Sequence, residues 1–388
     1  MYNFVYNIPT KIYFGGNQIS NLGKELKKFG NKVLLCYGGG SIKKIGLYDE
    51  VVEEIKKAGL ELFELNGIEP NPRVTSVKAG AEICKKEKID VLLAVGGGSV
   101  IDCTKAIGAA TFYEGDPWDL IIGKVKIEKA LPLVSILTLS ATGSEMDIFA
   151  VISNMDSNDK VGFASKEVLP KVSFLDPKNT FTVSPYQTAC GSVDILSHII
   201  ETYFNREGSM YMLDTFMEGM MKTVIKYAPI AMKNPENEEA RANLMWTSSW
   251  AINGFISSCQ TCTWTCHPIE HQLSAYYDIT HGLGLGILTP RWMKYVLDET
   301  NVDRFYNFGV NVFGIDKNLE PMEVANKSIE MLEKFLFEEL GLKKHLSDLG
   351  IDKTHFEIMA KKACNDGILN GFKPLNQKDI ENIYEMCL

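Results

Sequence analysis

Short apolar runs alternate with amphipathic stretches over the first 180 or so residues of the chain. The runs at 32–37, 90–95 and 131–138 are apolar almost throughout, which is typical of strands buried on both faces of a sheet. Between the first two runs, residues 48–58 and 74–87 repeat apolar positions at helical spacing. Strands that alternate with helices predict a parallel sheet with helices on both faces.

The pattern then changes to long helical periodicities with few strand-like runs. Residues 241–255 repeat apolar positions at helical spacing, and Ser184-Pro185 forms a good helix start because proline suits the first helical position. We therefore predict a boundary near residue 180. Residues 1–180 would form an α/β domain and residues 181–388 an all-helical domain.

Composition narrows the function classes. The chain has 388 residues, 45% hydrophobic and 23% charged, which is enough apolar material for two cores. Its formal charge of -9 disfavours binding to nucleic acid or anionic lipid. No apolar run approaches the roughly 20 residues of a membrane-spanning helix, and no signal peptide is evident. Nine cysteines, an odd number, favour a reducing cytoplasm over a disulfide framework.

Two near-copies stand out, KVLLCYGGGSI at 32–42 and DVLLAVGGGSV at 90–100. Glycines at a strand end let backbone N–H groups approach and cradle an anion. Neither copy matches GxGxxG, and a single triplet could simply form a tight turn, but two triplets in the same setting favour a dinucleotide. The residues predicted to bind it are Gly38, Gly39, Gly40, Ser41, Gly96, Gly97, Gly98 and Ser99.

The first triplet also suggests which dinucleotide binds. Ser41, Lys43 and Lys44 follow it with no carboxylate beside them in the sequence. An acidic residue there would bind a ribose hydroxyl and repel a 2′-phosphate, so its absence favours NADP over NAD, with Lys43 as a contact. The alternative is that the adjacent lysines form an ordinary solvated face.

Further polar contacts are predicted after the second triplet. Asp102 is expected beside the pyrophosphate, and the stretch LTLSATGSE at 137–145 offers the hydroxyls of Thr138, Ser140 and Thr142 to the cofactor. The alternative for this stretch is a polar loop with a helix cap that ends in Glu145.

Five side chains suggest a metal site. Asp194 and His198 are four residues apart in a helical segment, as are His267 and His271, and His281 follows shortly after. Residues four apart share one helix face, and a carboxylate with several imidazoles suits a divalent transition metal. Each histidine alone would more often be a packing residue, so the prediction depends on the group.

These motifs together identify a family. The chain resembles the iron-containing (group III) alcohol dehydrogenases, and is especially similar to their butanol dehydrogenase and broad aldehyde reductase branch. The matching motifs are GGGS at 38–41, GGGSVID at 96–102, SATGSEMD at 140–147, PK at 170–171, LDP at 175–177, the Asp194/His198 pair, CHPIEH at 266–271 and ITHGLGLGI at 279–287.

The resemblance implies an N-terminal nucleotide-binding domain, an all-helical C-terminal metal-binding and catalytic domain (a dehydroquinate synthase-like fold), and a homodimer. It implies four metal ligands, Asp194, His198, His267 and His281. It also implies that Lys160 lies near the nicotinamide ribose and that His271 lies beside the metal without being a ligand. His271 would be the catalytic proton relay, or would instead orient a neighbouring ligand. The family favours Fe²⁺, whereas the general order of affinity favours Zn²⁺.

The expected reaction is hydride transfer between NADPH and a short aldehyde such as butanal. A polyol or lactaldehyde reductase of the same family, a dehydroquinate synthase-like lyase and a non-catalytic nucleotide sensor remain alternatives. Position near the motifs suggests an apolar substrate wall made of Phe149, Val151, Phe163, Trp246 and Trp264. The cysteines at 259, 262 and 266 are read as packing thiols and not as a second metal site.

Overall fold

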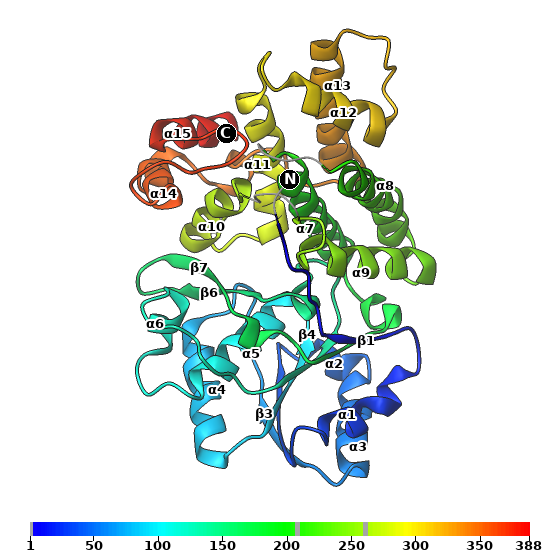
Figure 1. Ribbon diagram of the computed structural model, residues 1–388, viewed down its shortest axis with the longest axis vertical. Coiled ribbons are helices and arrows are strands. Elements are labelled where there is room, and N and C mark those ends of the chain that lie inside the picture. The colour runs from blue at the N-terminus through cyan, green and yellow to red at the C-terminus, as the bar shows by residue number, and fades with distance from the viewer. Residues whose placement is uncertain (1–2, 206–209, 259–262) are drawn as a thin grey trace. The chain divides into compact units, whose positions relative to one another are not determined.

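A computed structural model describes residues 3–205, 210–258 and 263–388 (Figure 1). The chain divides by compactness into two units. We call Asn7–Val183 with Pro235–Asn253 the sheet unit, and Met1–Tyr6, Ser184–Asn234 and Gly254–Leu388 the helical unit. The chain thus passes between the units at 6/7, 183/184, 234/235 and 253/254, and residues 235–253 return to the sheet unit. The predicted division into residues 1–180 and residues 181–388 remains a prediction.

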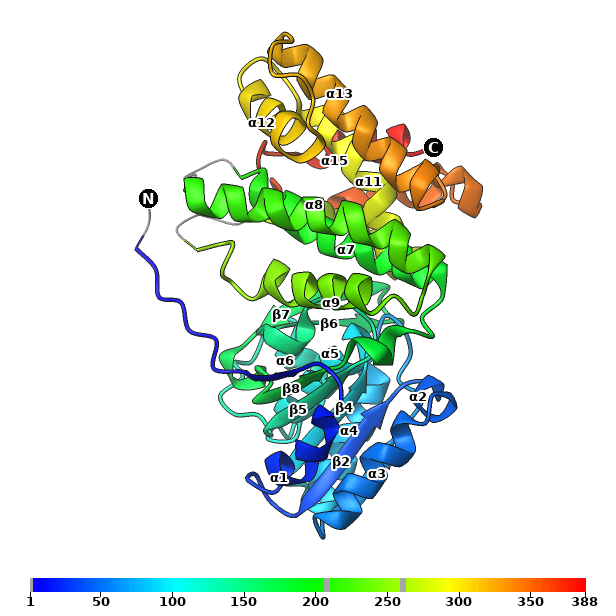
Figure 2. The same ribbon diagram turned by 90° about the vertical axis from the view of Figure 1, so that its right-hand side faces the viewer.

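The sheet unit is built on a six-stranded parallel sheet of order β1-β8-β5-β4-β2-β3. Strands β8, β5, β4 and β2 of this sheet can be followed in Figure 2. The three strands predicted from apolar runs are present as β2, β4 and β5. The strands are β1 (Lys11–Phe14), β2 (Lys32–Tyr37), β3 (Glu61–Leu65), β4 (Val91–Gly96), β5 (Leu133–Leu137) and β8 (Val172–Leu175). The parallel sheet predicted from the alternating pattern is therefore confirmed.

Helices cover both faces of this sheet. Alternate residues of β2 and β4 enter two different cores: Leu34 and Leu92 belong to one, Val33 and Val91 to the other. Each strand therefore has to be apolar on both sides, which explains the unbroken apolar runs. The helices of this unit are α1 (Leu22–Leu26), α2 (Ser41–Lys44), α3 (Leu47–Lys57), α4 (Val74–Glu87), α5 (Gly98–Ala110), α6 (Pro117–Ile121) and α9 (Glu238–Ile252).

An antiparallel hairpin lies outside the main sheet. It consists of β6 (Phe149–Asn154) and β7 (Asp159–Ala164), in which Ser153 is paired with Lys160. The sequence pattern did not predict this hairpin. Both strands are partly exposed, so they carry polar residues and do not form a continuous apolar run.

The helical unit contains no strand among the residues that the structure describes, which confirms the predicted all-helical class. Its first helix, α7, starts as predicted, because Ser184 Oγ accepts the backbone N–H of Gln187 and Pro185 occupies the first turn. Every residue of α7 from Thr188 to Tyr203 is buried, so α7 is the central helix of the unit. The others are α8 (Tyr211–Lys233), α10 (Cys266–Tyr277), α11 (His281–Val296), α12 (Val302–Phe313), α13 (Pro321–Lys334), α14 (Phe356–Ala363) and α15 (Gln377–Met386).

Candidate metal centre and dinucleotide site

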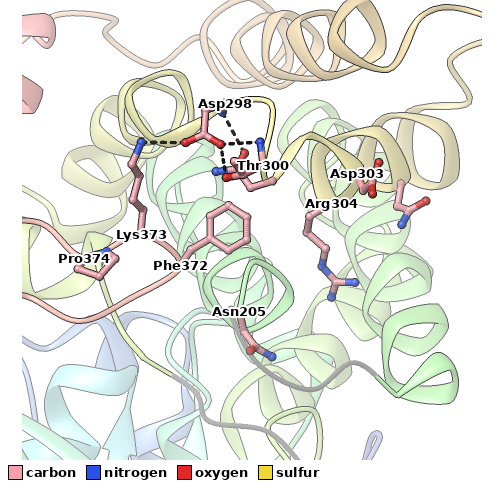
Figure 3. A pocket seen from close by; sticks show the side chains of 10 residues that line it. Asn205, Asp298, Thr300, Asp303, Arg304, Phe372, Lys373 and Pro374 are labelled. Carbon is pink, nitrogen blue, oxygen red and sulfur yellow. Dashed lines mark hydrogen bonds and ion pairs between the residues drawn. The ribbon is translucent and has the colours of Figure 1, made fainter.

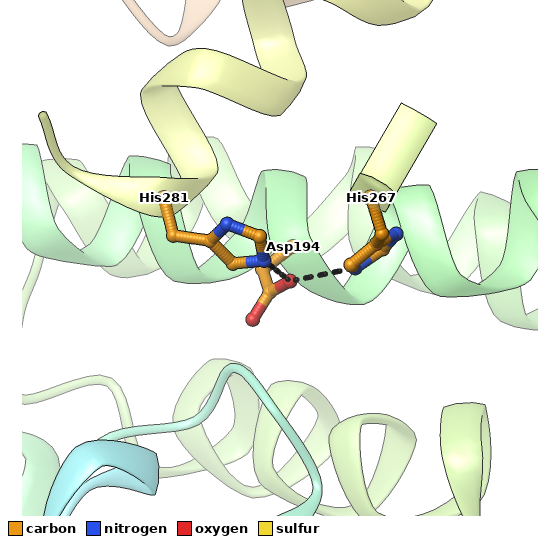
Figure 4. A group of neighbouring side chains, drawn as sticks. All are labelled: Asp194, His267 and His281. Atoms are coloured by element: carbon orange, nitrogen blue, oxygen red, sulfur yellow. Dashed lines mark ion pairs between the residues drawn. The ribbon is translucent and has the colours of Figure 1, made fainter. Parts of the chain in front are cut away.

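Three helices bring the predicted metal ligands together in the helical unit. Asp194 and His198 lie one turn apart on α7, His267 lies in the first turn of α10, and His281 is the first residue of α11. Oδ1 of Asp194 lies 3.7 Å from Nε2 of His198 and 3.7 Å from Nε2 of His267. It lies 3.6 Å from Nε2 of His281 (Figure 4). One carboxylate oxygen therefore faces three imidazole nitrogens.

Unsatisfied polar atoms mark the centre of this group. Asp194 Oδ1 and His267 Nε2 are buried and have no hydrogen-bond partner among the described residues. Such buried atoms are uncommon in folded proteins, and a bound ion is one explanation for them. A carboxylate oxygen with imidazole nitrogens is a suitable donor set for Fe²⁺ or Zn²⁺. The side chains present therefore fit a divalent transition metal.

Burial and charge give these groups unusual protonation behaviour. Burial lowers the pKa of His198 to about 4, so its ring is neutral near pH 7. Burial also disfavours charge on His267, but the carboxylates of Glu201 and Asp194 outweigh it and raise the pKa of His267 to about 10. Asp194 is buried too, but His198 and His267 hold the pKa of its carboxyl well below the ordinary value. Near pH 7 an ionised Asp194 carboxylate thus faces a neutral His198 ring and a protonated His267 ring, and a metal would displace a proton from His267 on binding.

His271 lies next to this group without joining the contact to Asp194. It lies one turn after His267 on α10, is half-buried, and its ring centre is 5.5 Å from that of His281. Ligand atoms of Glu270, His271 and His281 lie within 4.8 Å of one another. The roles of His271 and of the four ligands stay predictions.

The structure adds two residues that the sequence reading missed. Glu201 on α7 contacts Nδ1 of His267, and Glu270 on α10 contacts Nδ1 of His281. Both carboxylates are buried. The signal was present in the sequence, since each glutamate lies three residues after a predicted ligand, but that spacing is too common on helices to indicate a role.

Trp264, one of the predicted substrate-wall residues, borders the histidines. Its ring centre is 5.6 Å from that of His198 and 5.0 Å from that of His267, edge to face in both cases. Cys266, at the start of α10, is buried and free. The other two members of its predicted packing cluster, Cys259 and Cys262, lie outside the described residues.

The two glycine triplets meet at one point of the sheet unit. β2 and β4 are neighbours in the sheet, with Tyr37 opposite Val95, so the segments 38–41 and 96–99 follow adjacent carboxyl ends. From β2 the chain first adds β3 on one side and then β4 on the other, so the strand order reverses here. Parallel α/β sheets bind ligands at such a reversal.

The triplets differ in what surrounds them. A Cβ at Gly39 would meet no atom within 4 Å, whereas Gly40 has a φ of 97°, a conformation that favours glycine. In the second triplet, a Cβ would collide with Val100 at Gly96 and with Thr142 at Gly98, and would crowd Leu139 at Gly97. Around Gly39 the first triplet thus leaves open space for a ligand, although a Cβ at Gly38 would lie 3.1 Å from the backbone oxygen of Ile68, while the second triplet packs against its own unit.

The loop after β5 is held in place by buried polar contacts. Asp102 accepts the Ser144 hydroxyl at 2.5 Å and the Val151 backbone N–H at 2.9 Å. Both of its carboxylate oxygens therefore bind within the protein, and its contact with pyrophosphate stays a prediction. Thr142 accepts the Ser144 N–H at 3.2 Å, while Ser140 Oγ is buried with no hydrogen-bond partner among the described residues.

Lys105 extends this network. Its buried ammonium donates to Asp147 Oδ1 at 2.7 Å and to the carbonyls of Asp147 and Phe149 at 3.0 and 2.6 Å. Burial raises the pKa of Asp147 to about 7 in spite of this lysine. Lys160 on β7 is also buried. The backbone N–H of Thr138 donates to the Gly96 carbonyl at 3.0 Å. Glu145 is not a helix cap but a buried group bonded to Ser249.

A carboxylate does lie near the first triplet, contrary to the expectation from the sequence. Glu64, near the carboxyl end of β3, accepts the Tyr37 hydroxyl at 2.8 Å and the Tyr48 hydroxyl at 2.7 Å. Lys43 lies over both rings, 4.4 Å from the centre of Tyr48 and 5.2 Å from that of Tyr37. The bond to Glu64 raises the pKa of Tyr48 to about 12. Sequence inspection missed Glu64 because the neighbouring strand brings it in.

A separate cavity of about 610 Å³ lies in the helical unit (Figure 3). Its lining includes Arg304 and Lys373. Both cations are paired, Arg304 with Asp214 at 2.7 Å and Lys373 with Asp298 at 3.0 Å. None of the metal-site residues lines this cavity, and we assign it no role. No helix within the described part of the chain is long and apolar enough to cross a membrane.

Comparison with known proteins gives consistent results over both halves of the chain. Residues 9–177 match the iron-containing alcohol dehydrogenase model, and residues 188–388 match the C-terminal model of the Fe-containing alcohol dehydrogenase family. NADH-dependent butanol dehydrogenase A of Clostridium acetobutylicum is 49% identical over 99% of both chains. NADPH-dependent aldehyde reductase YqhD of Escherichia coli is 37% identical over 95% of this chain and 94% of its own.

Solved structures agree with the sequence comparison. The crystal structure of NADH-dependent butanol dehydrogenase A from Thermotoga maritima has a TM-score of 0.95 and 42% identity, with 99% of this chain and 98% of that chain covered. The fold, the matched motifs and the relatives thus indicate the same family. The chain belongs to the iron-containing alcohol dehydrogenase family, in its butanol dehydrogenase branch, and is an alcohol dehydrogenase.

Proposed function

We propose that this protein is a metal-dependent, NADP(H)-using alcohol dehydrogenase and aldehyde reductase that acts on short-chain substrates such as butanol and butanal. The observation that carries the proposal is the group of Asp194, His198, His267 and His281, with one carboxylate oxygen 3.6–3.7 Å from three imidazole nitrogens. A protein without metal chemistry would have little reason to bury such a group with unsatisfied atoms.

The four side chains would hold Fe²⁺, with Zn²⁺ as the competing ion. A bound cation would stabilise the negative charge that builds on the aldehyde oxygen as hydride arrives, and in reverse would lower the pKa of the alcohol. His271 is the candidate for moving the proton that the product alcohol requires, because it is half-buried beside His281. If it only orients a neighbour, its loss will lower metal affinity as much as activity.

The dinucleotide is proposed to bind at the strand-order reversal, with the open space around Gly39 next to its phosphates. Lys43 would attract a 2′-phosphate, which favours NADP. NAD is a second candidate for two reasons. Glu64 lies near the carboxyl end of β3, where a carboxylate can accept a ribose hydroxyl, and the Clostridium relative is NADH-dependent by name.

The substrate is proposed to be small and apolar because Trp264 borders the metal group. Polyol and lactaldehyde reductases and dehydroquinate synthase-like lyases remain the alternatives. One assay separates them: the protein is loaded anaerobically with Fe²⁺ or with Zn²⁺, and absorbance of NADPH and NADH is followed. Butanal and lactaldehyde are supplied with the reduced cofactors, and glycerol with NADP⁺ or NAD⁺. Fastest turnover with butanal and NADPH supports the proposal. No turnover with any of the three substrates contradicts it.

The metal site is tested by His267→Ala, with His345→Ala as the matched control because His345 lies outside the ligand group. We expect the first variant to lose bound metal and activity and the second to keep both. Full metal content in His267→Ala would remove the proposed ligand set.

Two further properties belong to the proposal. Apolar side chains of the N-terminal segment that are exposed in the single chain support a homodimer: Phe4 is 54% exposed and Val5 95%. Light scattering would test the oligomeric state. A cytoplasmic location is supported by the seven described cysteines, all buried and free. Cell fractionation would test the cytoplasmic location.

A further inference from the structure

We infer that Glu201 and Glu270 are positioning residues that orient two of the metal-binding histidines, each acting from one helix on the next. This inference depends on the proposed metal site. Glu201 on α7 contacts His267 on α10, and Glu270 on α10 contacts His281 on α11. Helix α7 therefore contributes two ligands and the carboxylate that aligns α10, and α10 contributes one ligand and the carboxylate that aligns α11.

Glu201 holds both the ring and the backbone of its target. Its Oε1 contacts Nδ1 of His267, and its Oε2 accepts the backbone N–H groups of Thr265 and Cys266 at 2.6 and 2.7 Å. The residue is only 2% exposed. Because those N–H groups lie at the start of α10, the same carboxylate fixes the end of the helix that carries His267.

Both carboxylate oxygens of Glu270 also have partners within the helical unit. Its Oε2 contacts Nδ1 of His281, and its Oε1 accepts the Ser274 hydroxyl at 2.5 Å. Space for it comes from Gly284 on α11, where a Cβ would lie only 2.7 Å from Cγ of Glu270. Helices α10 and α11 are thus shaped around this carboxylate.

The chemical consequence concerns the tautomer of each ring. A carboxylate that accepts from Nδ1 keeps the proton there and leaves the Nε2 lone pair for the metal. In both rings Nε2 is the atom that faces Asp194 Oδ1, at 3.7 and 3.6 Å. His198 differs, because its Nδ1 has no hydrogen-bond partner in the described part of the chain and its ring stacks on that of His267 at 4.7 Å.

A purely structural role is the alternative, since buried carboxylates also stabilise helix ends. The two roles differ in what a substitution changes. Loss of a positioning carboxylate weakens metal binding, whereas loss of a structural one lowers the stability of the metal-free protein and leaves affinity for the ion unchanged.

The test uses Glu201→Gln and Glu270→Gln in the full chain. Affinity for Zn²⁺ is measured by competition with a chromophoric chelator, Co²⁺ loading gives a visible spectrum of the site, and Tm is recorded for the metal-free forms. We expect each variant to bind Zn²⁺ about 10–100-fold more weakly, with altered Co²⁺ bands. The matched control is Glu218→Gln, a buried carboxylate of the same unit that accepts from Tyr203 at 2.9 Å and Asn311 at 2.8 Å.

The outcomes are distinguishable. Wild-type affinity and spectra in both glutamine variants, or an equal loss in Glu218→Gln, would overturn the inference alone. A wild-type protein that binds neither ion would overturn the proposed metal site. If the glutamine variants do not fold, Ser274→Ala replaces them: it removes the Ser274 hydroxyl bond to Oε1 of Glu270. We expect a several-fold loss of Zn²⁺ affinity, whereas unchanged affinity overturns the role of Glu270.

Discussion

Gly98 lies directly against the side chain of Thr142. A Cβ at position 98 would come within 2.3 Å of Thr142 Oγ1 and 2.5 Å of its Cγ2, so the second glycine turn and the loop after β5 pack together with no room between them. Gly39 in the first turn is the opposite case, since a Cβ there would meet nothing within 4 Å. The protein itself requires glycine at 98, and only a ligand would require it at 39.

Alanine substitutions should therefore separate stability from binding. Gly98→Ala overpacks a closed site, which costs about 1–3 kcal/mol, or roughly 2–4 °C of Tm for each kcal/mol. Gly39→Ala should keep the wild-type Tm and raise the KM for the dinucleotide about tenfold or more. Scanning fluorimetry and steady-state kinetics measure the two effects. Equal losses of Tm in both variants would contradict this account of the first turn.

Lys105 provides a second prediction. Lys105→Met leaves the Asp147 carboxyl and the Phe149 carbonyl buried without their cation, and breaking a buried pair costs about 3–5 kcal/mol. We expect Tm to fall by on the order of 10 °C. Lys78→Met is the control, because its pair with Asp116 is exposed on both sides and such pairs contribute about 0–1 kcal/mol. Similar Tm values for the two variants would show that the buried pair does not stabilise the loop.

Particular strands and site residues show what the sequence could and could not predict. β2, β4 and β5 were predictable because burial on both faces requires unbroken apolar runs. The edge strands β1 and β3 were not, since KIYF and ELFEL mix charged with apolar residues. Spacing along one helix indicated Asp194 with His198. Glu201, Glu270 and Glu64 were missed because each acts on a residue of another element, and only the fold brings such pairs together.

Acid stability should depend on Glu25. Burial raises the pKa of this carboxyl, but bonds from Lys11, Lys28 and Tyr13 outweigh it and hold the pKa at about 2, below the ordinary 4.5. A lowered pKa in the folded state stabilises the protein above pH 4.5, and this contribution is lost as pH falls towards 2. Urea unfolding should therefore show wild type more stable than Glu25→Gln at pH 7, with the difference shrinking below pH 4.5. A difference that stays constant with pH would mean that packing, not charge, causes it.

The choice of dinucleotide should depend on Lys43 and Glu64. Lys43→Met removes a cation that would bind a 2′-phosphate. Because a hydrogen bond to a charged group contributes about 1.5–3 kcal/mol, kcat/KM for NADPH should fall about 10–100-fold. The value of kcat/KM for NADH should change little. Lys44→Met, the adjacent lysine, is the matched control. Glu64→Gln should act in the opposite direction, because it removes a negative charge from the cluster that holds Lys43. If instead Glu64→Gln mainly lowers kcat/KM for NADH, the carboxylate accepts a ribose hydroxyl, and the natural cofactor is NAD.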